Sequence, residues 1–193
     1  MNDLENFRQI NSFEKKIILR SLSTDSSKIL QTLDDLHYFL YISFQQKETK
    51  NNYPVVFLIT MDQKKYLDLI NVKNLVYSVG LYFGFIKRSV FFLSLEGSEF
   101  LYENEILSES HHLSLNKKGE KSILYGNDIL KENVIIFSPN LRKDDFLVIK
   151  NTQNEIIAIA KSLINKQDLK ILNPRDKIAL NLVDKGYYLR KSQ

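Results

Sequence analysis

The sequence predicts an α+β protein of two domains, a mixed or antiparallel α/β domain followed by a small β-barrel. Helical and strand-like patterns alternate in the first half, but one strand there directly follows another. The second half carries several short strand-like runs separated by turn residues, which is typical of a barrel. With 193 residues and 44% apolar content, the chain can bury two cores.

The first domain is predicted to begin with two helices and two strands. Phe13, Ile17 and Ile18 share one face of a helix that starts after Asn11. Aromatic and β-branched residues farther on favour strands. The expected order is helix FEKKIILRSL, helix ILQTLDDL, strand HYFLYISF and strand YPVVFLIT.

A capping box marks the next helix, because Thr60 stands three residues before Gln63. That helix runs through KKYLDLI and ends near Asn71. The following NLVYSVGLYFGFIKRSVFFLSL predicts two or three strands broken at Gly80 and Gly84, and EGSEFLYEN returns to helix. Consecutive strands indicate a mixed or antiparallel sheet, with helices on one face.

The domain boundary is predicted within Ile106–Glu120, a segment that is polar, charged and aperiodic. The two domains then cover residues 1–112 and 113–193. Beyond the boundary, the runs expected as barrel strands are VIIFSP, DFLVIKN, EIIAIAKSL and KIALNLV.

Gly126 and Asn127 predict a short helix that begins at Asp128. Glycine allows backbone angles that other residues resist, and Asn127 can cap the first N–H groups of the helix. Free N–H groups at a helix start also favour an anion. A structural cap and a phosphate site are both open from these residues alone.

Several enzyme classes lack their usual residues here. The chain has no cysteine, so it has neither a thiolate nucleophile nor a Cys-based metal site. It contains no GxGxxG, P-loop, GxSxG or HExxH motif. His111 and His112 are adjacent in a polar stretch without an evident third ligand, so we predict no metal site. We expect a non-enzymatic protein without a cofactor and, as no apolar run is long enough to span a membrane, an intracellular one.

Charge is distributed unevenly along the chain. From Leu113 to Gln193 there are 15 Lys and Arg against 9 Asp and Glu, whereas residues 1–112 carry 12 against 14. Basic groups neutralise phosphates and aromatic rings stack on unpaired bases, so the second half suits RNA; the alternative is a solvated barrel loop. The residues predicted to bind RNA are Gly126, Asn127, Lys161, Lys166, Lys170, Arg175, Lys177, Lys185, Tyr187, Arg190 and Lys191.

Four stretches of the second half resemble the PUA domain, the RNA-binding module named after pseudouridine synthase and archaeosine transglycosylase. They are LYGNDILKENV, FLVIKN, EIIAIAKS and NLVDKGYYLRK. The resemblance implies a pseudo-β-barrel in which the LYGND turn leads into a helix that borders the RNA-binding groove. It also implies that the basic segment between the last two barrel strands lies near that groove.

The N-terminal half is similar to one PUA family, the Nip-seven ribosome-biogenesis factors. Strand VVFLIT, the helix after it and LVYSVGLYFGFIKRSVFFLSLEGSEFL follow the order of that family, and the likeness covers residues 53–191. It implies a non-enzymatic role in large-subunit assembly on pre-ribosomal RNA, with the N-terminal domain recruiting other assembly or RNA-processing proteins. We expect an archaeal-type member located in the cytoplasm; a eukaryotic member would be nucleolar.

Two other functions stay open. PUA domains often accompany RNA-modifying enzymes, so the chain could be such an enzyme or an accessory subunit of one. An assay for modified nucleosides separates this function from assembly. The second is a protein scaffold that contacts no RNA, whose binding would be insensitive to salt.

Overall fold

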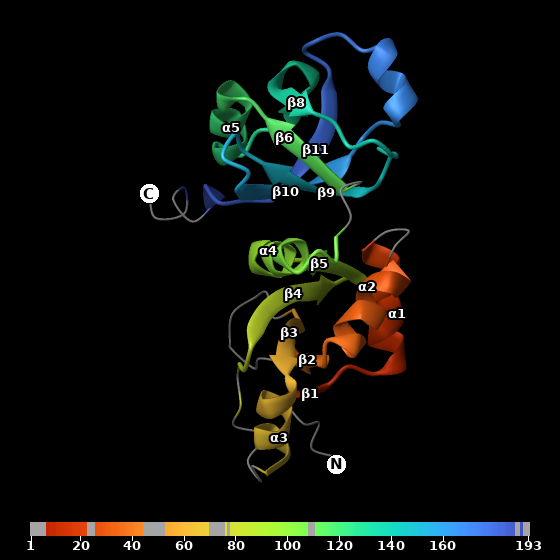
Figure 1. Ribbon diagram of the computed structural model, residues 1–193, viewed down its shortest axis with the longest axis vertical. Helices are drawn as coiled ribbons and strands as arrows, with labels where there is room; N and C mark the ends of the chain where they lie inside the picture. Colours follow the sequence, from red (N-terminus) through yellow and green to blue (C-terminus); the bar gives the residue numbers. More distant parts are fainter. Residues whose placement is uncertain are drawn as a thin grey trace. The chain divides into compact units, whose positions relative to one another are not determined.

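The computed structural model describes residues 7–22, 26–44, 53–69, 76, 78–107, 111–187 and 190 (Figure 1). The chain divides into two compact units, Met1–Gly97 and Ser98–Gln193. This division falls within helix α4 (Leu95–Glu103), and the boundary after residue 112 stays a prediction.

The described part of the N-terminal unit contains a five-stranded sheet in the order β1-β2-β3-β4-β5. Strands that follow each other in the chain therefore lie side by side in the sheet. Every neighbouring pair is antiparallel. The prediction of a mixed or antiparallel sheet is confirmed. The strands are β1 Phe7–Gln9, β2 Tyr38–Ser43, β3 Val55–Thr60, β4 Leu81–Lys87 and β5 Val90–Leu93.

Reciprocal caps start two helices of this unit where the sequence predicts them. In α1 (Ser12–Ser21), the Asn11 side chain accepts the Glu14 N–H and the Glu14 carboxylate accepts the Asn11 N–H. Thr60 and Gln63 make the same exchange before α3 (Met61–Leu69). Each cap satisfies N–H groups that the helix itself leaves unpaired.

Helices lie on both faces of the sheet, which corrects the expectation that they cover one face. Leu67 of α3 packs with Tyr41 of β2. Leu30 of α2 (Ser26–Asp35) instead lines a pocket together with Leu40 of β2. Neighbouring residues of a strand point to opposite faces, so α2 and α3 lie on opposite sides of β2.

Strand β4 continues through Gly84 rather than breaking there, which corrects a second expectation. Gly84 pairs with Val56 on one side and Leu93 on the other. A Cβ at this position would lie 2.7 Å from the Phe91 ring, so the close approach of the strands requires glycine. The chain reverses instead at the two residues between β4 and β5.

The described part of the C-terminal unit contains a six-stranded sheet in the order β7-β11-β10-β9-β6-β8. The β6–β9 pair is parallel and the other pairs are antiparallel. The sheet curls around a core that includes Leu113, Leu147 and Ile178, which gives the predicted barrel-like unit (Figure 1). The strands are β6 His112–Leu115, β7 Ile129–Leu130, β8 Val134–Ile136, β9 Phe146–Lys150, β10 Ile156–Ser162 and β11 Lys177–Asp184.

The segment predicted as an aperiodic linker contains β6 and the start of helix α5 (Lys117–Leu124). Asn116 caps α5, because its side chain accepts the Gly119 N–H at 2.8 Å. The helix therefore precedes Gly126, whereas the sequence predicted one that begins at Asp128. The described part of the unit also contains the short 3-10 helices η3 (Lys131–Asn133) and η4 (Lys166–Lys170).

Candidate RNA interface

Gly126 and Asn127 end helix α5 rather than starting a new helix. The Gly126 N–H donates to the Ile123 carbonyl at 2.8 Å, and the Asn127 N–H donates to the Ser122 carbonyl at 3.2 Å. These are the two bonds of a Schellman motif, which needs the positive φ of Gly126, +88°. Both N–H groups are thus bonded to carbonyls, and contact of these residues with RNA stays a prediction.

Asp128 joins the end of α5 to strand β11. Its carboxylate accepts a hydrogen bond from Lys177 Nζ at 3.0 Å and one from the Asn181 N–H at 3.1 Å. The Asn181 side-chain amide donates to the Ile123 carbonyl at 3.2 Å and to Asp184 Oδ2 at 3.0 Å. This network holds Lys177 beside the end of the helix.

Arg190 attaches the C-terminal segment to the same place. Its guanidinium makes a two-bond pair with the Asp184 carboxylate, each bond 2.9 Å long, and donates to the Leu124 carbonyl. The hydrogen bonds from Arg190 to Asp184 raise the pKa of Arg190, and the charge of that carboxylate acts in the same direction. A Cβ on Gly186 would lie 2.8 Å from Arg190 Nη1, so glycine leaves space for the pair.

Four residues predicted to bind RNA, Gly126, Asn127, Lys177 and Arg190, therefore meet where α5 joins β11. Two other predicted cations bind acids: Lys185 pairs with Glu99 and Lys161 with Asp144, each at 2.7 Å. The hydrogen bond from Lys161 lowers the pKa of Asp144. Tyr187 is 41% exposed, and Lys191 lies outside the described residues.

The basic segment before β11 is held to the barrel by lysine bonds. Lys166 Nζ donates to the Ser138 carbonyl at 3.0 Å. Lys131 of η3 reaches the same segment, because its Nζ donates to the Leu169 and Leu172 carbonyls at 2.8 and 2.7 Å. Lys131 is a supporting residue that sequence reasoning missed. The two remaining predicted cations of the segment, Lys170 and Arg175, are exposed.

Sequence reasoning also missed a basic face on α5. Lys117, Lys121 and Tyr125 are spaced four residues apart, so they follow one face of the helix and its C-cap. All three are exposed, and Tyr125 is 66% exposed. This α5 basic face (Lys117, Lys121 and Tyr125) would have been visible from the spacing if the helix had been placed before Gly126.

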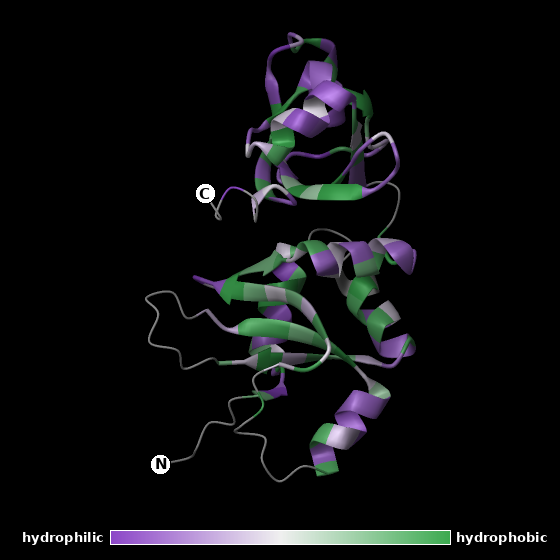
Figure 2. Cartoon of the chain, turned by 90° about the vertical axis from the view of Figure 1, so that its left-hand side faces the viewer, coloured by the Kyte–Doolittle hydropathy of each residue, from purple (hydrophilic) through white to green (hydrophobic). Residues whose placement is uncertain are grey.

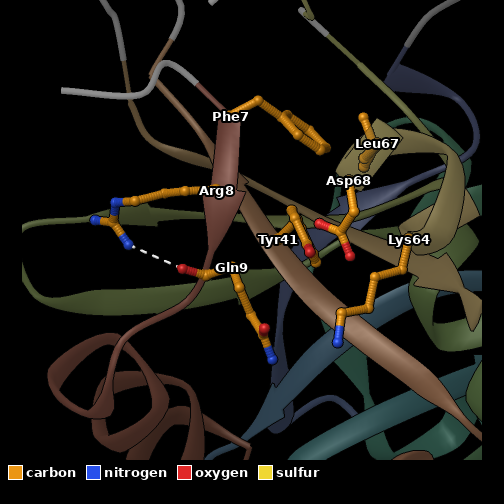
Figure 3. A pocket seen from close by; sticks show the side chains of 7 residues that line it. All are labelled: Phe7, Arg8, Gln9, Tyr41, Lys64, Leu67 and Asp68. Carbon is orange, nitrogen blue, oxygen red and sulfur yellow. Dashed lines mark hydrogen bonds between the residues drawn. The ribbon is translucent and has the colours of Figure 1, made fainter. Parts of the chain in front are cut away.

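The N-terminal unit holds a pocket of about 230 Å³ between β1, β2 and α3 (Figure 3). Arg8 at its edge donates to the Gln9 carbonyl and makes a two-bond pair with Glu14 at 2.6 and 2.9 Å. Burial alone would raise the pKa of Glu14, but the bonds from Arg8 and the Asn11 N–H outweigh it and lower that pKa. The charge of Arg8 is thus already compensated within the fold.

Two further observations concern only the described part of the chain. No group of three or more His, Asp or Glu lies there in an arrangement that could hold a metal ion. No helix there is long and apolar enough to cross a membrane. His112 begins β6 and His111 directly precedes it, and His111 is buried.

The barrel and the helix beside it define a protein with a C-terminal PUA domain. The family model of the UPF0113 PUA domain matches residues 111–193. A UPF0113 protein from Archaeoglobus fulgidus is 31% identical over 185 residues, which span 95% of this chain and 94% of that protein. The chain belongs to the UPF0113 family. Its PUA domain implies RNA as a binding partner.

Solved structures show the same fold over nearly the whole chain. A hypothetical protein from Pyrococcus horikoshii has a TM-score of 0.62 and 12% identity, covering 96% of this chain and 98% of that one. A PUA domain from Aeropyrum pernix, in complex with tartrate, has a TM-score of 0.60 and 10% identity, covering 95% and 88%. A conserved PUA domain protein from Thermoplasma acidophilum has a TM-score of 0.52 and 14% identity, covering 96% and 98%.

Proposed function

We propose that this protein is a non-catalytic ribosome-assembly factor of the Nip-seven type, which binds pre-ribosomal RNA of the large subunit through its PUA domain. The N-terminal unit then recruits other assembly or RNA-processing proteins, in the cytoplasm. The resemblance of the N-terminal half to Nip-seven factors supports the assembly role, and the PUA domain supports the choice of RNA as ligand.

The α5 basic face, beside the junction of α5 and β11, carries the proposal. Among the described residues no acid pairs with Lys117 or Lys121, so both ammonium groups are available to phosphates. Tyr125 adds an exposed ring on which an unpaired base can stack. The Asp128 and Arg190 bonds hold the end of the helix that presents these groups.

A non-catalytic role is supported by what the acids of this site do. Asp128 and Asp184 both accept hydrogen bonds that tie β11 to its neighbours. A carboxylate held in this way orients protein groups and is poorly placed to take a proton from a substrate. The alternative, an RNA-modifying enzyme or accessory subunit, predicts new modified nucleosides after incubation with RNA, which mass spectrometry of the digested RNA detects.

Crosslinking in cells, followed by sequencing of the attached RNA, tests the assembly role. We expect crosslinked reads to concentrate on precursor RNA of the large ribosomal subunit. A Lys117→Gln, Lys121→Gln double variant should lose most of these reads while staying folded. Reads confined to transfer RNA, or spread in proportion to RNA abundance, would contradict the role in assembly.

A further inference from the structure

Three aromatic side chains form a column across the N-terminal sheet. The rings of Tyr53 and Phe85 have centroids 5.9 Å apart with 30° between their planes. The rings of Phe85 and Phe92 lie 5.1 Å apart and are parallel within 10°. This aromatic column (Tyr53, Phe85 and Phe92) runs from the residues before β3, across β4, to the edge strand β5.

The column lies beyond the core on the α3 side of the sheet. Val55 is opposite Phe85 and packs against the core cluster of Tyr41 and Phe57, so the rings share that face. Helix α3 starts at the far end of β3, after Thr60. The three rings are half-buried, and in Figure 2 the strands of this unit are coloured largely in the green of hydrophobic residues.

The two ends of the column differ. Lys87 Nζ lies 4.7 Å from the centroid of the Tyr53 ring, so that ring already has a cationic neighbour. Phe92 belongs to edge strand β5 and has its ring partner, Phe85, on the β4 side. Another flat ring that approached from the edge would continue the stack on Phe92.

The charges around the column suit a ligand that carries phosphates. Residues 53–60 and 78–94, which contain β3, β4, β5 and the column, have no acid; their charged residues are Lys87 and Arg88. These strands are thus free of acids, although residues 1–112 as a whole have more acids than bases. Arg88 is exposed at the tip of the β4–β5 hairpin, where its positive φ of 49° is unusual for a non-glycine residue.

We propose that the aromatic column stacks one unpaired RNA base on Phe92, while Lys87 and Arg88 bind phosphates of the same strand. The ligand is a single strand, since a base within a duplex has no free face for the ring. The proposal rests on the RNA binding assigned to the PUA domain and adds a second contact in the other unit. An apolar protein partner would use the same rings without the cations.

Fluorescence of 2-aminopurine placed at each position of a twelve-nucleotide oligouridylate tests the proposal on the full chain. Stacking quenches this base, so we expect one or two positions to be quenched by the wild type and not by Phe92→Leu. Affinity should fall roughly 5- to 150-fold in Phe92→Leu, with an unchanged slope of log affinity against log salt, since stacking releases no counterions. Phe92→Tyr retains the ring and should behave as the wild type.

Phe13→Leu is the matched control, because Phe13 is 67% exposed on α1, outside the column. Wild-type quenching and affinity in both Phe92→Leu and Phe13→Leu would overturn the stacking site while leaving RNA binding by the PUA domain intact. Loss of a protein partner by Phe92→Leu with unchanged RNA affinity would overturn it in favour of protein docking. If the wild type binds no single-stranded RNA at all, the PUA proposal fails as well.

Discussion

At the scale of single residues, each unit contains an ion pair that connects separate segments of its backbone. Glu14 combines a helix cap with an ion pair, since it accepts bonds from the Asn11 N–H and from Arg8. The Glu14 side chain is 10% exposed and that of Arg8 is 24% exposed, so water screens the pair less than at an open surface. Arg190 and Asp184 have the corresponding role in the C-terminal unit.

The Glu14 pair predicts a pH dependence of stability. The lowered pKa means that the folded state favours the carboxylate, so its contribution is complete above the unfolded-state pKa of about 4.3 and is lost as pH falls through the lower folded-state pKa. Glu14→Gln should lower the free energy of unfolding by roughly 1–3 kcal/mol at pH 7, and by less near pH 3. Urea titrations at both pH values measure the difference.

Asp62→Asn is the control for this effect, because the Asp62 side chain is 94% exposed and its pair with Lys65 has a separation of 3.6 Å. It should change the free energy of unfolding by less than about 0.5 kcal/mol at either pH. An equal loss in Glu14→Gln at pH 7 and pH 3 would show that the carboxylate charge contributes nothing.

At the scale of elements, local chemistry could be predicted from the sequence, but distant contacts could not. The capping boxes at Asn11 and Thr60 lie within four residues, and both helices begin there. The sequence predicts a helix that begins at Asp128 instead of α5. The first turn of α5 is charged, and the helix packs against residues that are distant in the chain. Gly119, for example, lies so close to Asn133 that a Cβ would be 2.7 Å from the Asn133 side chain.

The candidate site also combines residues that the sequence predicts with distant contacts that it does not predict. Basic composition predicts Lys177 and Arg190 as RNA-binding residues, but it does not predict the residues that hold them. Asp128 and Lys177 are 49 positions apart, and neither periodicity nor a local motif links residues at that distance. The α5 basic face follows a simple helical spacing, and it was missed only because the helix itself was misplaced.

The β4–β5 hairpin allows a test of backbone strain. Lys87 pairs with Val90, so Arg88 and Ser89 form a two-residue turn, with φ of 49° and 60°. Because glycine adopts positive φ without the cost of a Cβ, Ser89→Gly should raise the free energy of unfolding by about 1 kcal/mol. Thermal unfolding followed by circular dichroism measures the change.

The same substitution in a regular helix should have the opposite sign. Ser122 lies inside α5, where glycine costs helix stability, so Ser122→Gly should lower the free energy of unfolding by roughly 0.5–1 kcal/mol. If both variants destabilise the protein equally, the left-handed backbone at Ser89 is not a source of strain.

At the scale of the whole molecule, residues 1–112 and residues 113–193 differ in charge, and we propose that both contact RNA. Residues 113–193 have the excess of bases and contain the PUA fold, and we expect them to supply the phosphate contacts. Residues 1–112 have an excess of acids, but residues 53–60 and 78–94 within them, which contain β3, β4, β5 and the aromatic column, have none. We therefore expect most of the affinity to come from the C-terminal unit, and the N-terminal unit to extend the length of RNA that is bound.

The salt dependence of RNA affinity tests the central claim most directly. Each phosphate contact to a single strand contributes about −0.7 to the slope of log affinity against log salt. Replacing the exposed Lys117, Lys121 and Lys170 by Gln should flatten the slope by roughly 2, whereas the same change at the exposed Lys15, Lys16 and Lys65 removes equal charge from the N-terminal unit and should leave it nearly unchanged. Equal slopes in the wild type and the first variant, with circular dichroism showing that both are folded, would contradict RNA binding by these lysines of the PUA domain.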